Sequence, residues 1–256
     1  MTKNYVSVTA GKDAEEVRAV LAEFEKAGYS VTQEHIPVLG IQVSEKTLNG
    51  IKPKNFRFAR FAEIPSLMKI TEGKAMPVIH YNTKNTRTLY EQVSKCFEEI
   101  REYCSMVQVN AIFPDISQIE KIKELGLKVS LQVDYRGMNL NDVIDKVASY
   151  GSCLDYVLID PSRGRGDIFD IEDSAFLYSE IKARQPDCGL VFAGGFCGDN
   201  AEDVLKKVID RIQTKDFSIC AEGKLRDKAS DEHWGQDNLN IDKVRKYLQA
   251  VKKILN

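Results

Sequence analysis

The sequence predicts a (β/α)8 barrel, the TIM-barrel class of α/β fold with parallel strands. Three observations predict it. Strand-like and helical patterns alternate along the whole chain, eight segments read as strands, and the 256 residues match the length of about 250 that this barrel needs. Alternating strands and helices imply parallel strands joined by crossover helices. We therefore expect a single barrel domain over residues 1–256. An open doubly wound sheet is the alternative, but no glycine-rich turn follows the first strand, which argues against its dinucleotide-binding form.

The expected strands are short and rich in β-branched residues. Tyr156-Val157-Leu158-Ile159 is continuously apolar, as expected of a parallel strand that is buried on both faces. The eight segments are Tyr5–Thr9, Ile36–Val43, Met76–Tyr81, Met106–Asn110, Leu127–Val133, Tyr156–Asp160, Leu190–Ala193 and Phe217–Cys220.

Between these segments, apolar residues recur at the i, i+3, i+4 and i+7 spacing of an amphipathic helix. Clear stripes begin at Val17, Leu89, Ile116, Leu140, Val204 and Ile241, and two less regular ones lie around Glu63–Thr71 and Ser174–Ala183. Two strand-to-helix connections are long, about Ser44–Phe61 and Ala221–Asn238. Such connections build the active-site face of this fold, so we expect both to contribute to function.

The composition is that of an ordinary globular protein, with 43% hydrophobic and 29% charged residues and a net charge of −2. This balance predicts neither a nucleic-acid nor a membrane-surface partner. No apolar run approaches the roughly 18 residues of a membrane span, and the polar start is unlike a signal peptide, so we expect a cytoplasmic protein. The six cysteines form no C-x-x-C pair, which predicts reduced thiols with no metal site and no disulfide framework.

Paired glycines follow the seventh expected strand. Gly194 and Gly195 precede a helix that starts near Asn200, and Gly223 and Lys224 follow the eighth strand. Glycines let backbone N–H groups approach an anion closely, and the phosphate site of such barrels commonly lies after strands seven and eight. One such pair would be explained by a tight turn alone. Glycines at both strand ends favour a phosphate site, and hence a small phosphorylated metabolite as the partner.

An acid and two arginines lie at the end of the sixth strand. Asp160 follows an apolar run, so its side chain is expected in the barrel mouth, where partial burial would raise its pKa and suit it to general acid or base catalysis. Arg163 and Arg165, on a glycine-spaced loop, are candidates to clamp a carboxylate or phosphate. The alternative is that Asp160 caps the following turn and both arginines are solvated.

Further polar residues end the neighbouring strands. His80 ends the third, Asn110 the fourth, and Asp134 and Arg136 follow the fifth. We expect all four to line the same mouth, although a lone histidine at a strand end is more often structural than catalytic.

Together these residues resemble the phosphoribosylanthranilate isomerase family. The resemblance rests on Tyr156–Asp160 with the Gly164-Arg165-Gly166 loop, on Phe192-Ala-Gly-Gly195 before Asp199-Asn200, and on Ser218 to Gly223. It implies an Amadori rearrangement of an N-ribosyl aldose phosphate to an amino-ketose phosphate, with no cofactor. By resemblance, Asp160 falls on the general acid, Gly166 on a phosphate contact, and Arg57 on the substrate-binding arginine that follows strand two.

The first half of the chain departs from that family. Its first strand carries a Lys-Ile-Cys-Gly motif whose cysteine is the general base, whereas here Thr9 or Ala10 holds that place. Its fourth-strand Gln-Leu-His-Gly is replaced by Gln108-Val-Asn110-Ala, and Glu222 precedes Gly223 where the family has Ser-Gly. A general base typically contributes about 10²–10⁴-fold to the rate, so an active isomerase needs a replacement. His80 and Asp134 are the candidates.

Three functions therefore stay open. The first is an isomerase of this type acting on a phosphorylated sugar derivative. The second is another barrel chemistry, such as an aldolase-type lyase, which would want a strand lysine for a Schiff base; Lys128 lies at the wrong end of its strand. The third is a binding protein that kept the phosphate site without catalysis. Either a monomer or a homodimer is expected.

Overall fold

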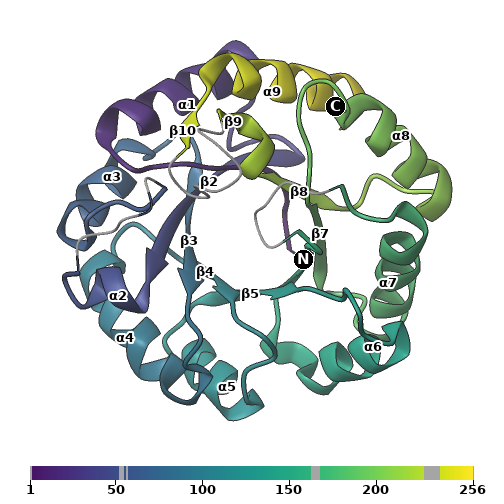
Figure 1. Cartoon of the computed structure of the whole chain (residues 1–256), viewed down its shortest axis with the longest axis horizontal. Coiled ribbons are helices and arrows are strands. Elements are labelled where there is room, and N and C mark those ends of the chain that lie inside the picture. Colours follow the sequence, from purple (N-terminus) through teal and green to yellow (C-terminus); the bar gives the residue numbers. More distant parts are fainter. Residues whose placement is uncertain (1, 52–54, 56, 163–167, 228–236, 256) are drawn as a thin grey trace.

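Eight parallel strands close into a barrel in chain order, with β8 pairing back onto β1. The computed structural model describes residues 2–51, 55, 57–162, 168–227 and 237–255. Figure 1 views the barrel end-on. The strands are β1 (Asn4–Thr9), β2 (His35–Ser44), β3 (Met76–Asn82), β4 (Met106–Asn110), β5 (Lys128–Val133), β6 (Tyr156–Ile159), β7 (Gly189–Ala193) and β8 (Ser218–Ala221). The predicted (β/α)8 barrel is confirmed, and every predicted strand end lies within one residue of the observed one.

Helices form a ring outside the strands, as Figure 1 shows. They are α1 (Ala14–Lys26), α3 (Ile64–Ile70), α4 (Leu89–Ile100), α5 (Ile116–Glu124), α6 (Leu140–Ser149), α7 (Ile171–Arg184), α8 (Ala201–Ile212) and α9 (Ile241–Leu255). Both helices with weak sequence patterns, α3 and α7, are present. None of the helices in the described part of the chain is long and apolar enough to cross a membrane.

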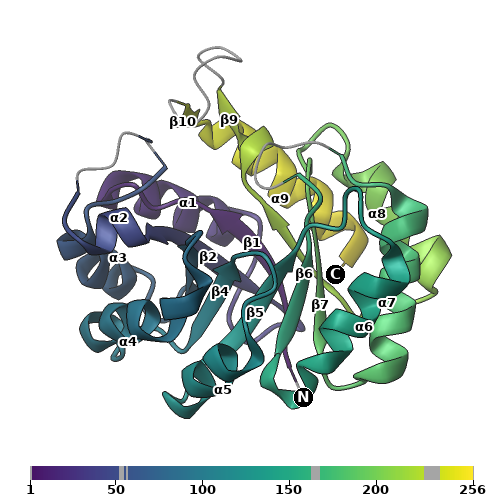
Figure 2. The same ribbon diagram turned by 60° about the horizontal axis from the view of Figure 1, so that its bottom comes forward.

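Smaller elements decorate the connections. They are α2 (Glu45–Leu48), the 3-10 turns η1 (Phe61–Glu63), η2 (Thr86–Thr88), η3 (Gly151–Cys153) and η4 (Gly223–Leu225), and the antiparallel ribbon of β9 (Arg226–Asp227) and β10 (Asn238–Leu239). The ribbon, with η4, belongs to the long connection after β8. It rises at the end of the barrel opposite the N-terminus, where the strands end (Figure 2).

Side-chain caps start several helices where the sequence supplies them. The carboxylate of Asp13 accepts from the backbone N–H of Glu16 at α1, and that of Asp170 accepts from the N–H of Asp173 at α7, each at 2.9 Å. Such a cap typically stabilises a helix by about 1 kcal/mol because it satisfies an N–H that has no partner within the helix. The boundaries of α1 and α7 are therefore set locally.

The barrel interior is filled by one apolar cluster from alternate strand positions, including Tyr5, Val38, Val78 and Leu158. A second, larger cluster lies between the strands and the outer helices. At the bottom of the interior the rings of Tyr5 and Tyr156 meet edge-on at 5.3 Å between centroids. This floor is a packed core, so ligand access is confined to the mouth at the strand ends.

We expect Gly40→Ala to destabilise the protein. Gly40 lies on β2 beneath the imidazole of His80, and an added Cβ would stand 2.5 Å from Nε2. Overpacking of this kind typically costs about 1–3 kcal/mol of unfolding free energy, measurable by urea denaturation. His80→Ala in the same chain should recover part of the loss by clearing the space. Simple additivity of the two single effects would contradict this assignment.

Candidate active site

Polar side chains replace apolar ones where the strands reach the mouth. Successive residues of a strand point to opposite faces, so residues two positions beyond an interior residue are also interior. Val78 is followed in this way by His80 and Asn82, and Leu158 by Asp160. The resulting interior polar positions at the mouth are Thr9, Gln42, His80, Asn82, Gln108, Asn110, Gln132, Asp134, Asp160 and Glu222.

Asp160 is 5% exposed and directly follows β6. Its Oδ1 accepts from the backbone N–H and the hydroxyl of Ser162, at 2.8 and 2.7 Å, and its Oδ2 accepts from Nε2 of Gln132 at 2.6 Å. These donors favour the ionised carboxylate. Asp160 therefore lies at the end of β6 and also caps the turn that follows it.

Glu222 is a second carboxylate in the mouth, at the end of β8. Its side chain is 15% exposed, and its Oε1 accepts from Nη1 of Arg57 at 2.8 Å and from Nε2 of Gln42. Burial raises the pKa of Glu222; the charges of Arg57 and Arg226 lower it, the charge of Asp160 raises it, and the net shift is upward. Within the described part of the chain, Oε2 accepts no hydrogen bond. Glu222 thus keeps one oxygen for proton exchange.

Arg57 joins Glu222 to a third carboxylate. Its guanidinium is 3% exposed and donates from Nε to Oδ1 of Asp237 at 3.0 Å and from Nη2 to Oδ2. Burial raises the pKa of Asp237, but hydrogen bonds from Arg57 and the charges of Arg57 and Arg226 outweigh it, and the net pKa is lowered. The residue expected to bind substrate is therefore already engaged by two carboxylates of its own chain.

A second buried arginine ties the connection after β8 to the first strand. Arg226 is 2% exposed, and its Nη2 lies 3.3 Å from the carbonyl oxygen of Thr9 and 3.8 Å from Oε1 of Glu16. Glu16 in turn accepts from the N–H of Gly11 at 2.7 Å. A charge buried this deeply persists only with such partners, so the network holds the start of β9 against the mouth.

His80 lies below the carboxylates. It is 3% exposed, and its Nδ1 is 3.4 Å from Oγ1 of Thr9 and 3.4 Å from Nε2 of Gln108. Burial lowers its pKa to about 4, so the ring is neutral at neutral pH. Thr9 occupies the interior position at the end of β1, where the resemblance places a cysteine, and His80 is its neighbour.

The buried His80 should make stability depend on pH. Above pH 6.5 its ring is neutral in the folded and unfolded states; between 6.5 and about 4 only the unfolded chain takes up the proton, so stability falls as pH falls. The shift corresponds to about 3 kcal/mol. We expect His80→Gln to flatten the change in unfolding free energy between pH 7 and pH 4 by about that amount, measured by urea denaturation. Parallel pH profiles for the two proteins would refute this.

Asp134 and Asn110 line the rim. Asp134 forms an ion pair with Arg136 at 3.1 Å, and the Arg136 side chain is 39% exposed. Nδ2 of Asn110 donates to Oδ1 of Asn82 at 3.2 Å, and its own Oδ1 accepts from Gln108 at 2.9 Å. Both carboxylates are paired with an arginine, but among the described residues Glu222 keeps its Oε2 without a hydrogen bond and its pKa is raised, which makes it the stronger candidate for the second catalytic group.

The turn after β7 has the expected glycine geometry. Gly194 and Gly195 have φ of +105° and +71°, a region that favours glycine. The Asn200 side chain accepts from the N–H of Cys197 and donates to the carbonyl of Gly195, both at 2.8 Å, just before α8. The turn is thereby held rigidly at the N-terminus of that helix.

Of the other residues expected to bind phosphate or a carboxylate, the structure describes Gly223 and Lys224. Gly223 is buried and opens η4, and Lys224 beside it is exposed. Arg163, Arg165 and Gly166 lie outside the described residues.

Two further residues, Lys128 and Cys220, are unsuited to act as a nucleophile or base at the mouth. Lys128 opens β5 at the closed end of the barrel and is exposed there. The Cys220 thiol lies 3.6 Å from Oγ1 of Thr9, but burial raises its pKa to about 12, so almost none of it is thiolate at neutral pH.

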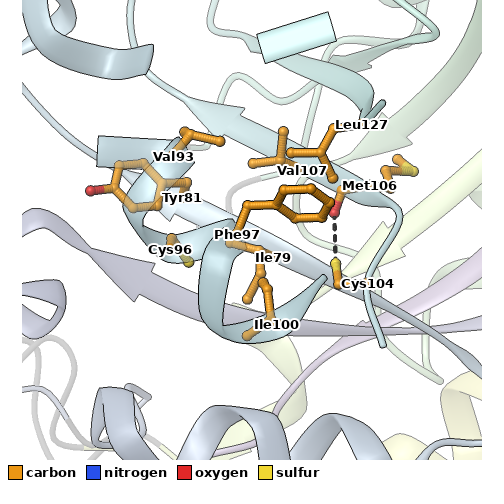
Figure 3. A pocket seen from close by; sticks show the side chains of 10 residues that line it. All are labelled: Ile79, Tyr81, Val93, Cys96, Phe97, Ile100, Cys104, Met106, Val107 and Leu127. Atoms are coloured by element: carbon orange, nitrogen blue, oxygen red, sulfur yellow. Dashed lines mark hydrogen bonds between the residues drawn. The ribbon is translucent and has the colours of Figure 1, made fainter. Parts of the chain in front are cut away.

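A small apolar cavity lies away from the mouth, between α4 and strands β3 and β4. Figure 3 shows its lining, which includes Tyr81, Phe97 and Cys104, with the Cys104 thiol donating to the carbonyl of Met106 at 3.1 Å. Its volume of about 10 Å³ corresponds to roughly one water molecule. It is a packing gap of the outer core and no substrate site.

Sequence reasoning missed Gln42, Asn82 and Gln132, and noted Glu222 only as a departure from a family motif. A signal for the first three was present. Polar residues at i and i+2 interrupt otherwise apolar strand ends, as in His80-x-Asn82 and Gln132-x-Asp134. In a barrel this alternation places both residues of each pair on the interior face.

Comparisons with known proteins were made for sequence and for structure. No protein-family model matches the sequence, and no curated protein matches it. Among solved structures, phosphoribosyl anthranilate isomerase from Thermus thermophilus matches with a TM-score of 0.64 at 16% identity, over 97% of this chain and 98% of that one.

Two further structures are similar. A phosphoribosyl anthranilate isomerase in complex with reduced 1-(o-carboxyphenylamino)-1-deoxyribulose 5-phosphate matches with a TM-score of 0.62 at 14% identity, over 98% of this chain and 99% of that one. The YdjI aldolase from Escherichia coli K12 matches at 0.55 and 12%, over 98% and 90%. These TM-scores establish a shared fold: over nearly its whole length the chain has the same (β/α)8 barrel as the phosphoribosylanthranilate isomerases.

Proposed function

We propose that this protein is an aldose–ketose isomerase of the Amadori type, acting on a phosphorylated sugar derivative. One observation carries the proposal: Asp160 and Glu222, at the ends of β6 and β8, are two buried carboxylates in one mouth whose charges interact. The strand between them, β7, ends in the small residue Ala193.

Such a pair can hold one proton on one carboxyl while the other is ionised. Repulsion between two nearby negative charges makes the two carboxyls lose their protons at different pH values. The reaction needs one group to protonate the ring oxygen as the ring opens and one to remove the proton from C2. The resulting enol-amine then accepts a proton at C1 and loses the proton of its C2 hydroxyl as the ketone forms, so that no atom is gained or lost overall.

The surroundings of the two carboxylates suggest their roles. Three donors favour the ionised form of Asp160, whereas burial raises the pKa of Glu222. We therefore propose that Glu222 carries the proton before the reaction and acts as the ring-opening acid, and that Asp160 acts as the base. The family resemblance would make Asp160 the acid. With Glu222 as the acid, the rate falls as pH rises through the pKa of Glu222, and Glu222→Gln removes that limb of the pH profile.

The glycine turn supports a phosphate end. Backbone N–H groups at Gly194–Phe196, in the turn that leads into the 12-residue helix α8, are suited to an anion because the dipole of that helix is positive at its start. The structural relative bound to a reduced deoxyribulose 5-phosphate supports the same class of ligand.

The direct test is turnover of a panel of N-ribosyl amine 5-phosphates, including phosphoribosyl anthranilate, with the ketose product identified by NMR. Formation of an amino-ketose phosphate, lost in Asp160→Asn, is the expected result. Binding of the panel without turnover would overturn the isomerase and leave a phosphosugar-binding barrel.

A further inference from the structure

Three amides form a continuous hydrogen-bonded row, here termed the amide belt: Gln42, Asn82 and Asn110, at the ends of β2, β3 and β4. Nδ2 of Asn110 donates to Asn82 at 3.2 Å, and Nδ2 of Asn82 lies 3.5 Å from Oε1 of Gln42. Gln42 in turn donates to Oε1 of Glu222. The belt therefore runs directly to one of the two carboxylates proposed to react.

The hydrogen bonds of the amide belt leave some of its donor and acceptor sites unused. A carboxamide offers two N–H donors and two acceptor sites. Within the described part of the chain, Asn110 uses one donor and one acceptor, toward Asn82 and Gln108, and Gln42 likewise uses one of each. Asn82 and Asn110 are half-buried. Nδ2 of Asn82 is already used, because it also donates to the carbonyl oxygens of His80 and Val43 at 3.0 and 3.2 Å, so the unused capacity lies on Asn110 and Gln42. An amide with unused capacity gains from a ligand that supplies the missing hydrogen bonds.

The charge on this side of the mouth decides the ligand class. Arg57 lies on this side of the mouth, but its guanidinium is already bound by Glu222 and Asp237. What the belt itself presents is a mixture of neutral donors and acceptors. Hydroxyl groups, which both donate and accept, match such a surface, whereas a carboxylate, which only accepts, would leave the acceptor oxygens of the amides without donors.

The position of the belt relates it to the rest of the substrate. In a closed eight-stranded barrel of this order, β3 lies opposite β7, so the belt faces the glycine turn across the mouth. A substrate with its phosphate at Gly194–Phe196 and its reacting carbons near Asp160 and Glu222 would extend toward the belt.

We propose that the amide belt binds an uncharged, hydroxyl-bearing substituent on the amine of the substrate, in place of an aromatic carboxylate. This inference rests on the proposed function, because it takes the phosphate end and the carboxylate pair as fixed points.

The test uses three stable probes that share 1-amino-1-deoxyribitol 5-phosphate and differ in the amine substituent: 2,3-dihydroxypropyl, propyl or 2-carboxyphenyl. Affinities are measured by calorimetry for the intact protein, for Asn110→Ala and Asn82→Ala, and for the surface control Asn141→Ala on α6. Thermal unfolding checks that each variant folds. We expect the dihydroxypropyl probe to bind about tenfold more tightly than the propyl probe.

In Asn110→Ala that preference should fall to near unity while the affinity for the propyl probe is unchanged, and Asn141→Ala should behave as the unmodified protein. Asn82→Ala provides the same comparison if Asn110→Ala does not fold. Equal or tighter binding of the propyl or carboxyphenyl probe, or a preference that survives both belt variants, overturns the inference and leaves the proposed function standing. Failure of all three probes and of inorganic phosphate to bind overturns the proposed function, and the inference with it.

Discussion

Asp160→Asn and Glu222→Gln are each expected to lower kcat by about 10²–10⁴-fold, the usual contribution of a general acid or base. Both changes preserve size, and both remove the ability of the side chain to exchange a proton. Because the two groups act in one proton-transfer sequence, the double variant should be little slower than the worse single variant.

The measurement is steady-state turnover with the best substrate of the panel, together with affinity for its reduced analogue. Asp134→Asn is the matched control, since Asp134 lies on the same face but is paired with Arg136. It should lose much less activity. A loss in Asp134→Asn equal to that in Glu222→Gln would transfer the second catalytic role to Asp134.

Arg57→Met is expected to reduce the unfolding free energy by about 3–5 kcal/mol, the cost of removing one partner from a buried ion pair. The substitution keeps the apolar stem but leaves Glu222 and Asp237 buried without their cation. The loss should be largest at neutral pH. It should shrink in acid, because Asp237, whose pKa Arg57 lowers, can then become neutral by taking up a proton.

Arg60→Met is the matched control on the same connection. The Arg60 side chain is 69% exposed and lies 4.0 Å from Glu63, so its replacement should alter stability by no more than about 0.5 kcal/mol. Urea denaturation of both variants at pH 7 and pH 5 decides the matter. If Arg57→Met costs no more than Arg60→Met, the buried network does not stabilise the fold.

The barrel itself could be read from the sequence because its signals are local. A continuous apolar run such as Tyr156–Ile159 and a stripe such as Val17 to Phe24 each depend on residues within one element. The weaker pattern of α7 was harder to recognise, since buried positions such as Ser174 are not apolar. Eight repeats of strand and helix then leave few architectures other than a closed barrel.

Only part of the candidate site could be predicted from the sequence. Asp160 and the Gly194-Gly195 turn could be recognised because each lies at a strand end with a local signature. Arg57 was expected, by resemblance, to bind substrate, whereas its contacts with two carboxylates of its own chain could not be foreseen. The role of Glu222 could not be recognised, because a glutamate before a glycine has no distinctive pattern.

By itself, the sequence determined the order and bounds of the strands and helices, and which polar residues stand at the strand ends. Only the tertiary structure decided which of them meet. Arg57 reaches Glu222 across 165 residues of chain and Asp237 across 180, and the Gln42 contact with Glu222 spans 180. Periodicity reports the environment of one element at a time, whereas the partner of a buried charge is set by barrel closure, which brings the ends of β2 and β8 to the same side of the mouth.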